Sequence, residues 1–381
     1  MANHAVFGLI GVGGISQSQH LPNLTRAEGV RLKTVCDLRE DLLKQMQAKY
    51  GVPHATTDHR EVLADPEIDA VLIATREDAH VPLTVEALKA GKHVYVEKPL
   101  AETAEQARPV LEAQKASGKF VVIGHNRRFA PAYRKVMEIL RDRGGPRHIH
   151  YRVSDAYWNW GRSYGAGKRV VHELCHVFDI LRVLTGSEVA SVYCAEVRPD
   201  DETIVLTFRS GCVASIMSTG YVYWDMPKER LEVILDMGAL TIEDFVELTT
   251  FGLAGWEHCY RFAGHTHPDR DSTHERLYEK LGAEALLAVR RTYWENRTRL
   301  EYLVAEGVEG AERRRLEAYM AVVPNVGYSV NKGWIPALEH FAKSIVEGRQ
   351  PELAGPEDGI EIARITEAVI HSRQGRKIVE L

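Results

Sequence analysis

Two histidines lie four residues apart in the segment His172-Glu173-Leu174-Cys175-His176. The segment fits H-E-x-x-H, in which two histidines bind zinc and the glutamate acts as a general base. On a continuous helix over 170–185, positions 172, 176 and 179 would lie within about 60° of one another at ~100° per residue. One edge of this helix, with two imidazoles and the Asp179 carboxylate, could hold a metal ion or line a site for proton transfer.

A zinc site of this type needs a third ligand, and some H-E-x-x-H enzymes take it from a glutamate in E-x-x-x-D. Glu196 and Asp200 have this spacing. Those enzymes, however, place the glutamate on a second helix, whereas "VASVYCAEV" (189–197) is rich in β-branched and aromatic residues and is typical of a strand. We therefore expect no metal, and we look for the chemistry of these histidines in the rest of the chain.

The apolar run over residues 5–12 ends in a glycine motif, which is typical of a strand that leads into a phosphate-binding turn. Gly11, Gly13 and Ser16 form G-x-G-x-x-S. The first glycine permits a tight turn, the second lets the backbone approach a pyrophosphate, and the small third residue lets the helix pack closely on the strand. The motif predicts a dinucleotide-binding domain.

A second predicted strand, "VRLKTVCD" (30–37), ends in Asp37. A carboxylate at this place accepts hydrogen bonds from an adenosine ribose and repels a 2′-phosphate, which favours NAD over NADP. Arg39 weakens this preference because an arginine there can pair with the phosphate. Asp37 could instead, or in addition, be the N-cap of the helix that follows.

Strand and helix patterns then alternate, which predicts a parallel sheet with helices on both faces. Ligands bind at the carboxyl ends of such strands, so residues there are placed for chemistry. The segments are 68–75, 80–91, 93–99, 103–118 and 120–126, and the residues at the strand ends are Thr75, Glu97, Lys98 and His125.

From residue 147 onward strand patterns dominate, which predicts a largely antiparallel sheet with the helix 170–185 packed on it. A helical segment at 272–307 lies within an apparent insertion near 255–333, for which we expect a role as a lid or subunit contact. The predicted strands are 147–156, 189–197, 202–209, 212–224, 229–237 and 239–251.

The composition is that of a globular protein, with 45% hydrophobic and 27% charged residues in a chain of 381. The net charge of −5 argues against a nucleic-acid or anionic-membrane partner, and no apolar run is long enough to span a membrane. The 5 cysteines are scattered without a C-x-x-C pair, as expected for reduced thiols in a cytoplasmic protein.

Three segments together resemble the Gfo/Idh/MocA oxidoreductases: "GLIGVGGISQSQHLPNL", "IATREDAHVPLTVEALKAGKHVYVEKP" and "GHNRRFAPAY". The resemblance resumes at 176–186 and 355–381, and the E-K-P triplet is its most specific part. It implies a Rossmann domain, expected over 1–126, and an α/β domain with an open, mainly antiparallel sheet, expected over 127–381. It also implies a homo-oligomer, a dimer or tetramer, formed through that sheet.

The resemblance further implies roles for individual residues. Lys98 matches a lysine that contacts the reacting hydroxyl, His176 matches an acid/base histidine, and Asp179 completes the H-x-x-D motif of which His176 is the first residue. The chain departs from the family at His172, where many members have a substrate-binding aspartate, and at 76–77, where Arg-Glu replaces the common Pro-Asn.

Chemistry supports these assignments, because oxidation of a secondary alcohol requires loss of a hydride and of a proton. A histidine with a pKa near neutrality suits proton transfer, and a lysine at the same oxygen stabilises a developing alkoxide. We expect cofactor contacts from Gly11, Gly13, Gly14, Ile15, Asp37, Thr75, His80, Glu97 and Lys98, and substrate contacts from His172, Asp179, Trp158, Tyr157 and Arg127.

The aromatic loop 155–169 could stack on a sugar ring, or its aromatic residues could equally belong to a core or an interface. The sequence thus predicts an NAD-dependent dehydrogenase of a polyol, inositol or sugar derivative. Two other functions stay open: an NAD-dependent glycosidase that oxidises its substrate transiently, and a non-catalytic sensor that binds the cofactor.

Overall fold

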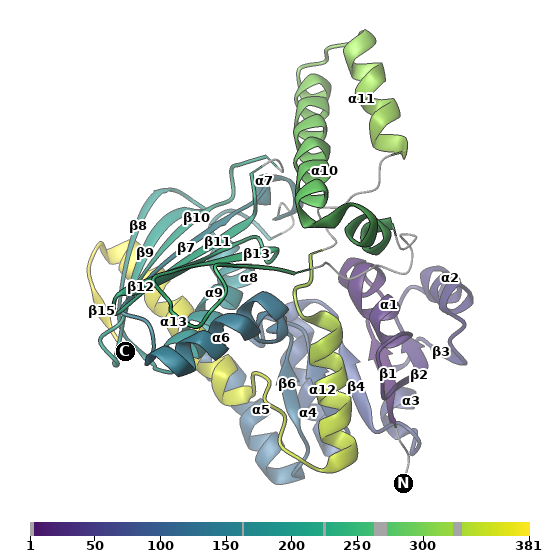
Figure 1. Cartoon of the computed structure of the whole chain (residues 1–381). Helices are drawn as coiled ribbons and strands as arrows, with labels where there is room; N and C mark the ends of the chain where they lie inside the picture. Colours follow the sequence, from purple (N-terminus) through teal and green to yellow (C-terminus); the bar gives the residue numbers. More distant parts are fainter. Residues whose placement is uncertain (1–3, 162–163, 224–225, 263–272, 323–329) are drawn as a thin grey trace. The chain divides into compact units, whose positions relative to one another are not determined.

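The computed structural model describes residues 4–161, 164–223, 226–262, 273–322 and 330–381. The chain forms two compact units (Figure 1). We call the first the Rossmann unit; it comprises residues 1–130, 171–180 and 333–368. We call the second the sheet unit; it comprises residues 131–170, 181–332 and 369–381. The chain therefore returns twice to the Rossmann unit after the predicted domain boundary at residue 126.

The Rossmann unit contains a six-stranded sheet in the order β3-β2-β1-β4-β5-β6, with all pairs parallel. Because the strand order reverses between β1 and β4, the carboxyl ends of these strands form the crevice where such sheets bind ligands. The parallel sheet predicted from the alternating pattern is confirmed. The strands are β1 Ala5–Ile10, β2 Val30–Cys36, β3 His54–Thr56, β4 Ala70–Ile73, β5 His93–Val96 and β6 Val121–Ile123.

Apolar side chains cover both faces of this sheet. One cluster joins Phe7 and Leu9 of β1 to Phe341 of α12, and the other joins Val6 and Ile10 to helices on the opposite face. Alternate residues of β1 thus serve opposite faces, as a strand buried on both sides requires. The helices of the unit include α2 Glu40–Tyr50, α3 His59–Ala64, α4 His80–Lys89, α5 Ala104–Ser117, α12 Trp334–Glu347 and the first turns of α13 Pro356–Gly375.

Helix α5 shows how local sequence sets the bounds of an element. The Thr103 side chain accepts a hydrogen bond from the Gln106 amide, and the Gln106 side chain accepts one from the Thr103 amide. This reciprocal capping box starts the helix, and Gly118 ends it in the left-handed conformation at φ 65°. The helix predicted over 103–118 is confirmed as Ala104–Ser117.

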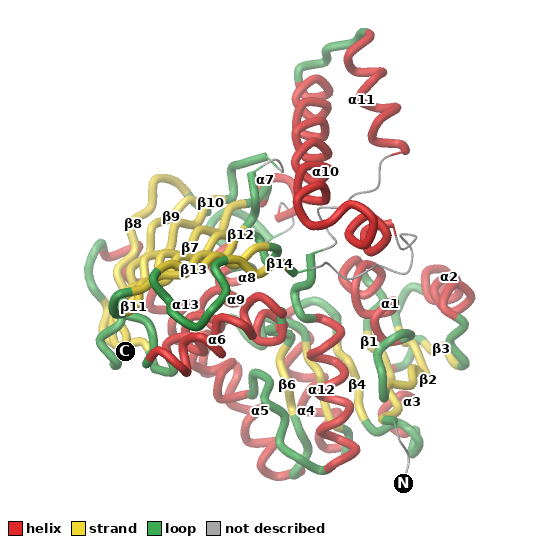
Figure 2. Tube along the Cα trace, viewed as in Figure 1, coloured by secondary structure: helices red, strands yellow, loops and turns green. Residues whose placement is uncertain are grey.

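The sheet unit contains a nine-stranded sheet in the order β14-β13-β12-β11-β7-β10-β9-β8-β15, drawn in yellow in Figure 2. Its pairs are antiparallel except β7 with β10, which confirms the predicted open, mainly antiparallel sheet. The strands are β7 His148–Ser154, β8 Val189–Arg198, β9 Asp201–Phe208, β10 Val213–Thr219, β11 Glu229–Leu235, β12 Gly238–Glu243, β13 Glu247–Phe251, β14 Cys259–Arg261 and β15 Val379–Glu380.

The prediction of one strand over 239–251 is wrong, because β12 and β13 form a hairpin within that range. Asp244 and Phe245 lie between the two strands at positive φ, 46° and 67°, and this left-handed pair reverses the chain. Leu240 and Ile242 before the turn and Val246 and Leu248 after it share one alternating pattern that only Asp244 interrupts, so we assigned a single strand.

The insertion forms α10 Thr273–Ala305 and α11 Ala311–Val322, which contact each other and are drawn in red in Figure 2. This confirms the helix expected over 272–307, while the role of the insertion as a lid or subunit contact stays a prediction. Within the described ranges no helix is both long enough and apolar enough to cross a membrane.

The continuous helix expected over 170–185 is also a wrong prediction, since the segment forms α8 Arg169–His172 and α9 Leu174–Thr185. In an unbroken helix the His172 carbonyl would accept a hydrogen bond from the His176 amide. Here it accepts one from Lys98 Nζ at 2.7 Å, and the His176 amide donates to the Glu173 carbonyl instead. A tertiary contact from Lys98, which follows β5, therefore takes the place of a helical hydrogen bond.

Candidate active site

The predicted phosphate-binding turn follows β1. Gly11 has φ 98°, and a Cβ there would lie 2.4 Å from the Ala74 carbonyl oxygen, so only glycine fits. Ser16 Oγ donates to the Gly11 carbonyl at 2.6 Å and holds the turn closed. A Cβ on Gly13 or Gly14 would meet nothing within 4 Å. The backbone at these two glycines is therefore open to close approach, as a pyrophosphate-binding turn requires.

Asp37, immediately after β2, is tied to the glycine turn. Its Oδ2 accepts the Val12 amide at 2.8 Å, and its Oδ1 accepts the Arg39 amide and Nε, each at 3.0 Å. Burial raises the pKa of Asp37, but the bonds from Arg39 and Val12 outweigh it, and the net pKa is lowered. The alternative role as N-cap of α2 is not seen, because Arg39 occupies that position. The lowered pKa keeps the carboxylate ionised at neutral pH.

His80 joins two loops at the carboxyl edge of the sheet. Its Nδ1 lies 2.8 Å from the Pro99 carbonyl oxygen and its Nε2 lies 3.3 Å from the Thr75 carbonyl oxygen. A neutral imidazole can donate to only one of these oxygens. His80 thus lies between the segment after β4 and the turn after β5, where the Lys98–Pro99 peptide is cis, and hydrogen-bonds one of the two carbonyls.

Glu97 is a buried carboxylate that contacts His20 and the backbone of Lys98. Its Oε1 lies 2.8 Å from His20 Nε2, and its Oε2 accepts the Lys98 amide at 3.1 Å. Burial raises the pKa of Glu97, but His20 and then Lys98 lower it by more. Gly124 leaves room for this carboxylate, since a Cβ there would lie 3.0 Å from Oε1. Glu97 therefore fixes the backbone from which the Lys98 side chain extends.

Lys98, His172, His176 and His125 come together in the Rossmann unit. Lys98 Nζ reaches the His172 carbonyl, and the rings of His125 and His176 meet edge to face with centroids 5.4 Å apart. Burial lowers the pKa of His125 to about 4, so this ring is neutral at physiological pH. The arrangement places an amine and a histidine from distant parts of the sequence at one edge of the sheet.

Two arginines of "NRRF" hold the segment that carries the histidines. Arg127 NH2 donates to Glu173 Oε1 at 3.1 Å, and both partners are buried. Arg128 binds both oxygens of Asp179 and also lies 3.0 Å from Asp358 of α13. The predicted substrate contacts of Arg127 and Asp179 stay predictions, and in this structure each residue has a buried ionic partner.

These contacts bear on the zinc hypothesis. Glu173, which would be the general base of a zinc enzyme, is bound to Arg127. Glu196, the proposed third ligand, lies on strand β8 rather than on a helix and pairs with Arg373 at 3.2 Å. Over the ranges that the structure describes, no group of three or more His, Cys, Asp and Glu could hold a metal ion.

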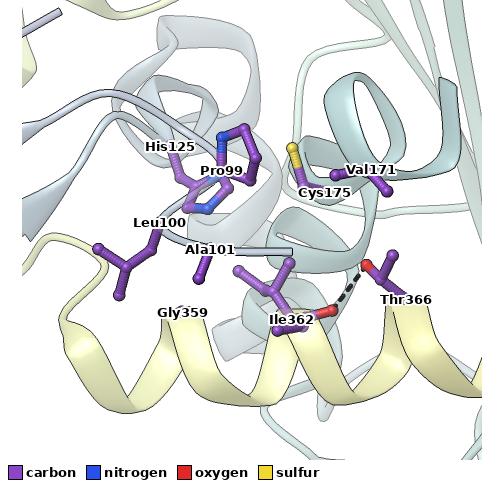
Figure 3. A pocket seen from close by; sticks show the side chains of 10 residues that line it. Pro99, Leu100, Ala101, His125, Val171, Cys175, Gly359, Ile362 and Thr366 are labelled. Atoms are coloured by element: carbon purple, nitrogen blue, oxygen red, sulfur yellow. Dashed lines mark hydrogen bonds between the residues drawn. The ribbon is translucent and has the colours of Figure 1, made fainter. Parts of the chain in front are cut away.

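A small pocket lies behind His125, between the turn after β5 and helix α13 (Figure 3). Figure 3 shows Gly359, Ile362 and Thr366 along α13, facing Leu100 and Ala101. The lining side chains leave room for about one water molecule. A polyol needs more space, so this pocket is not the substrate site.

Tyr157 and Trp158 belong to the sheet unit. Tyr157 is 3% exposed and packs against Gly161 and Gly220, while Trp158 Nε1 donates to the Val222 carbonyl at 3.2 Å. Their stacking on a substrate stays a prediction, and the side chain of Trp160 lies outside the described residues.

Sequence reasoning missed two members of the site, His20 and Asp358. His20 lies 77 residues before its partner Glu97, so no local pattern relates the two. A glutamate at the end of a buried strand, directly before Lys98, was the available signal that a basic partner had to exist.

Known proteins agree with this architecture. Residues 6–125 match the Gfo/Idh/MocA family, described as an oxidoreductase family with an NAD-binding Rossmann fold. The myo-inositol 2-dehydrogenase of Thermotoga maritima is 29% identical over 268 residues, which cover 64% of this chain and 76% of that protein. An inositol 2-dehydrogenase/D-chiro-inositol 3-dehydrogenase of Shouchella clausii is 34% identical over 194 residues, 49% of this chain and 54% of that protein.

Among solved structures, scyllo-inositol dehydrogenase from Lactobacillus casei with bound NAD(H) and scyllo-inositol superposes with a TM-score of 0.70. The alignment covers 99% of both chains at 16% identity. At this identity the likeness shows that the fold is shared across both units.

Proposed function

Because the chain belongs to the Gfo/Idh/MocA family of NAD-binding oxidoreductases, we propose that it oxidises a secondary hydroxyl of a polyol, inositol or sugar derivative with NAD. The observation that carries this proposal is the hydrogen bond from Lys98 Nζ to the His172 carbonyl at 2.7 Å. It brings a lysine at the carboxyl end of β5 to the segment that bears His176, and both lie in the unit that carries the glycine turn.

The proposed cofactor contacts follow the strand ends. The pyrophosphate binds at Gly13 and Gly14, where the backbone is open, with Ile15 beside them. Asp37 accepts hydrogen bonds from the adenosine ribose, and its charge selects NAD over NADP. The remaining contacts come from the edge that follows β4 and β5, at Thr75, His80, Glu97 and Lys98.

In the proposed reaction Lys98 donates a hydrogen bond to the reacting oxygen and stabilises it as the alkoxide develops. His176 accepts the hydroxyl proton as the general base. The bound nicotinamide supplies the hydride acceptor. Glu97 keeps Lys98 in place, and Arg128 with Asp179 anchors the helix that carries His176. His172 contacts a further group of the substrate.

The test is a turnover assay with purified protein, NAD and a panel of inositols, sugar alcohols, aldoses and glycosides. A dehydrogenase releases NADH in proportion to the ketone formed, and Lys98→Ala under the same conditions is the inactive control. Substrate cleavage with no net NADH would instead identify the glycosidase, and cofactor binding without turnover of any of these compounds would identify the sensor.

A further inference from the structure

His20 lies at the end of the segment that follows the glycine turn, and the proposed reaction does not use it. The segment Ser16–His20 forms a π-helical turn, in which the Leu21 amide donates to the Ser16 carbonyl five residues before it. Such turns are rare and often occur at functional sites. The Ser16 hydroxyl also closes the glycine turn through its bond to the Gly11 carbonyl. The glycine turn and His20 therefore belong to one continuous element.

The far end of this element contacts Glu97, the residue before Lys98. His20 is 3% exposed and Glu97 is 4% exposed, and His20 Nε2 lies 2.8 Å from Glu97 Oε1. Because an ionised carboxylate only accepts hydrogen bonds, Nε2 is the nitrogen that donates. The other oxygen of Glu97 accepts the Lys98 amide at 3.1 Å. The glycine turn and the turn that carries Lys98 are therefore connected through two hydrogen bonds to one buried carboxylate.

The His20 ring is held by aromatic side chains from two other elements. Tyr95 of β5 and Trp334 at the start of α12 meet it edge to face, with ring centroids 6.1 Å and 5.4 Å away. Gly333, directly before Trp334, has φ 86°, and a Cβ there would lie 2.4 Å from the Ala130 amide nitrogen. The start of α12 is thus in close contact with the backbone that follows the "NRRF" turn. The core of the Rossmann unit therefore keeps the imidazole in place.

We propose that His20 is a positioning residue for the reaction, because it acts through Glu97 to hold Lys98 at a fixed place relative to the glycine turn. Hydride transfer requires that the substrate oxygen, bound by Lys98, and the cofactor, bound at the turn, keep one geometry. Small misplacements of the reacting groups cost large factors in rate. A hydrogen-bonded bridge between the two turns supplies this constraint. The inference rests on the proposed dehydrogenase function, since it assigns a further residue to the same site.

Two substitutions separate the hydrogen bond of His20 from its packing. His20→Gln keeps a neutral N–H donor for Glu97, whereas His20→Leu fills the space and leaves Oε1 without that donor. His93 provides the control, because it lies at the opposite end of β5 from Lys98 and its Nδ1 accepts the Phe120 amide at 2.9 Å. His93→Leu therefore removes a histidine hydrogen bond from the same strand without touching the turn that carries Lys98.

The kinetic test compares these variants with NAD and the polyol that the wild type oxidises fastest. His20→Leu should lower kcat per folded molecule about tenfold, the equivalent of one charge-assisted hydrogen bond, and should leave the dissociation constant of NAD unchanged. His20→Gln should recover most of the loss, and His93→Leu should match the wild type. In a Glu97→Gln background, His20→Leu should add little. An equal loss in both backgrounds, or full kcat in His20→Leu, would overturn the proposal.

Hydrogen exchange of the Lys98 amide gives a readout that does not need turnover. This amide donates to Glu97, so its exchange rate reports how firmly the turn is held. Followed by NMR, exchange should be about tenfold faster in His20→Leu than in the wild type, His20→Gln and His93→Leu. Unchanged exchange in His20→Leu would sink the inference. If the wild type oxidises no polyol but exchange in His20→Leu quickens, the proposed function fails while the link between the two turns stands.

Discussion

Each unit buries an arginine bound by carboxylates, but the surroundings of the two arginines differ. In the Rossmann unit, Arg128 binds Asp179 and Asp358. In the sheet unit, Arg169 is fully buried and donates to Asp155 at 3.2 Å, to the Val153 carbonyl and to Ser218. The same residue types are thus desolvated and paired in both places.

The difference lies in what stands next to each arginine. Asp179 is on the helix that carries His176, and Lys98 uses one of its three ammonium donors on a backbone carbonyl. Around Arg169 the polar groups bind one another. Asp200, for example, accepts the backbone amides of residues 167 and 169. Buried charge alone therefore does not mark a reaction site; groups that can exchange protons or bind a further oxygen do.

The largest effect should come from the groups assigned to the reaction. Lys98→Ala and His176→Ala should each lower kcat by about 10²–10⁴-fold, the usual contribution of a general acid or base. Since both act on one oxygen, their combined loss should be less than the product of the two. Steady-state kinetics, together with a cofactor titration and a melting curve, measure this.

Both variants should still bind NAD, because the glycine turn and Asp37 are unchanged. Near-normal turnover of His176→Ala, or a lowered melting temperature as its only defect, would place His176 with Arg169 as a structural residue. The general base would then have to be sought elsewhere, with Lys98 as the next candidate.

Arg169 should show the opposite behaviour. Replacement by alanine leaves Asp155 buried without its guanidinium partner, and breaking a buried ion pair costs about 3–5 kcal/mol of unfolding free energy. Chemical denaturation should show this loss, while kcat per folded molecule stays close to that of the wild type. A large fall in kcat with unchanged stability would contradict the comparison, because it would show that Arg169 contributes to the reaction rather than to the stability of the fold.

The fold was largely predictable because periodicity and glycine chemistry act locally. The strand ends placed Glu97, Lys98 and His125 at one edge, and the structure has them there. The break at Glu173 was not predictable, because it results from Lys98 taking the His172 carbonyl, a contact between residues 74 apart. Glu77 and His172 stood out separately as departures from the family, but only the fold places the two side by side.

A third charged pair, Asp37 with Arg39, is exposed on its arginine side, with 61% of that side chain accessible. The exposed pair itself contributes little to stability, so the loss of stability in Asp37→Ala should come from the Val12 amide, which loses its acceptor at a cost of about 1–3 kcal/mol. A second effect should appear in ligand choice, because we propose that Asp37 accepts from the adenosine ribose, and it also occupies Arg39.

In the wild type a 2′-phosphate would meet the Asp37 charge and would find Arg39 already paired, so NAD should bind more tightly than NADP. Asp37→Ala removes the acceptor for the ribose and releases Arg39 for the phosphate. The preference should therefore narrow by about tenfold, the equivalent of one charge-assisted hydrogen bond. Fluorescence titration of both cofactors gives the ratio of their dissociation constants. The double variant with Asp37→Ala and Arg39→Ala should lose the NADP affinity that Asp37→Ala alone gains. Tighter binding of NADP to the wild type would reverse the assignment, since it would mean that Arg39 leaves Asp37 for the phosphate even when the carboxylate is present.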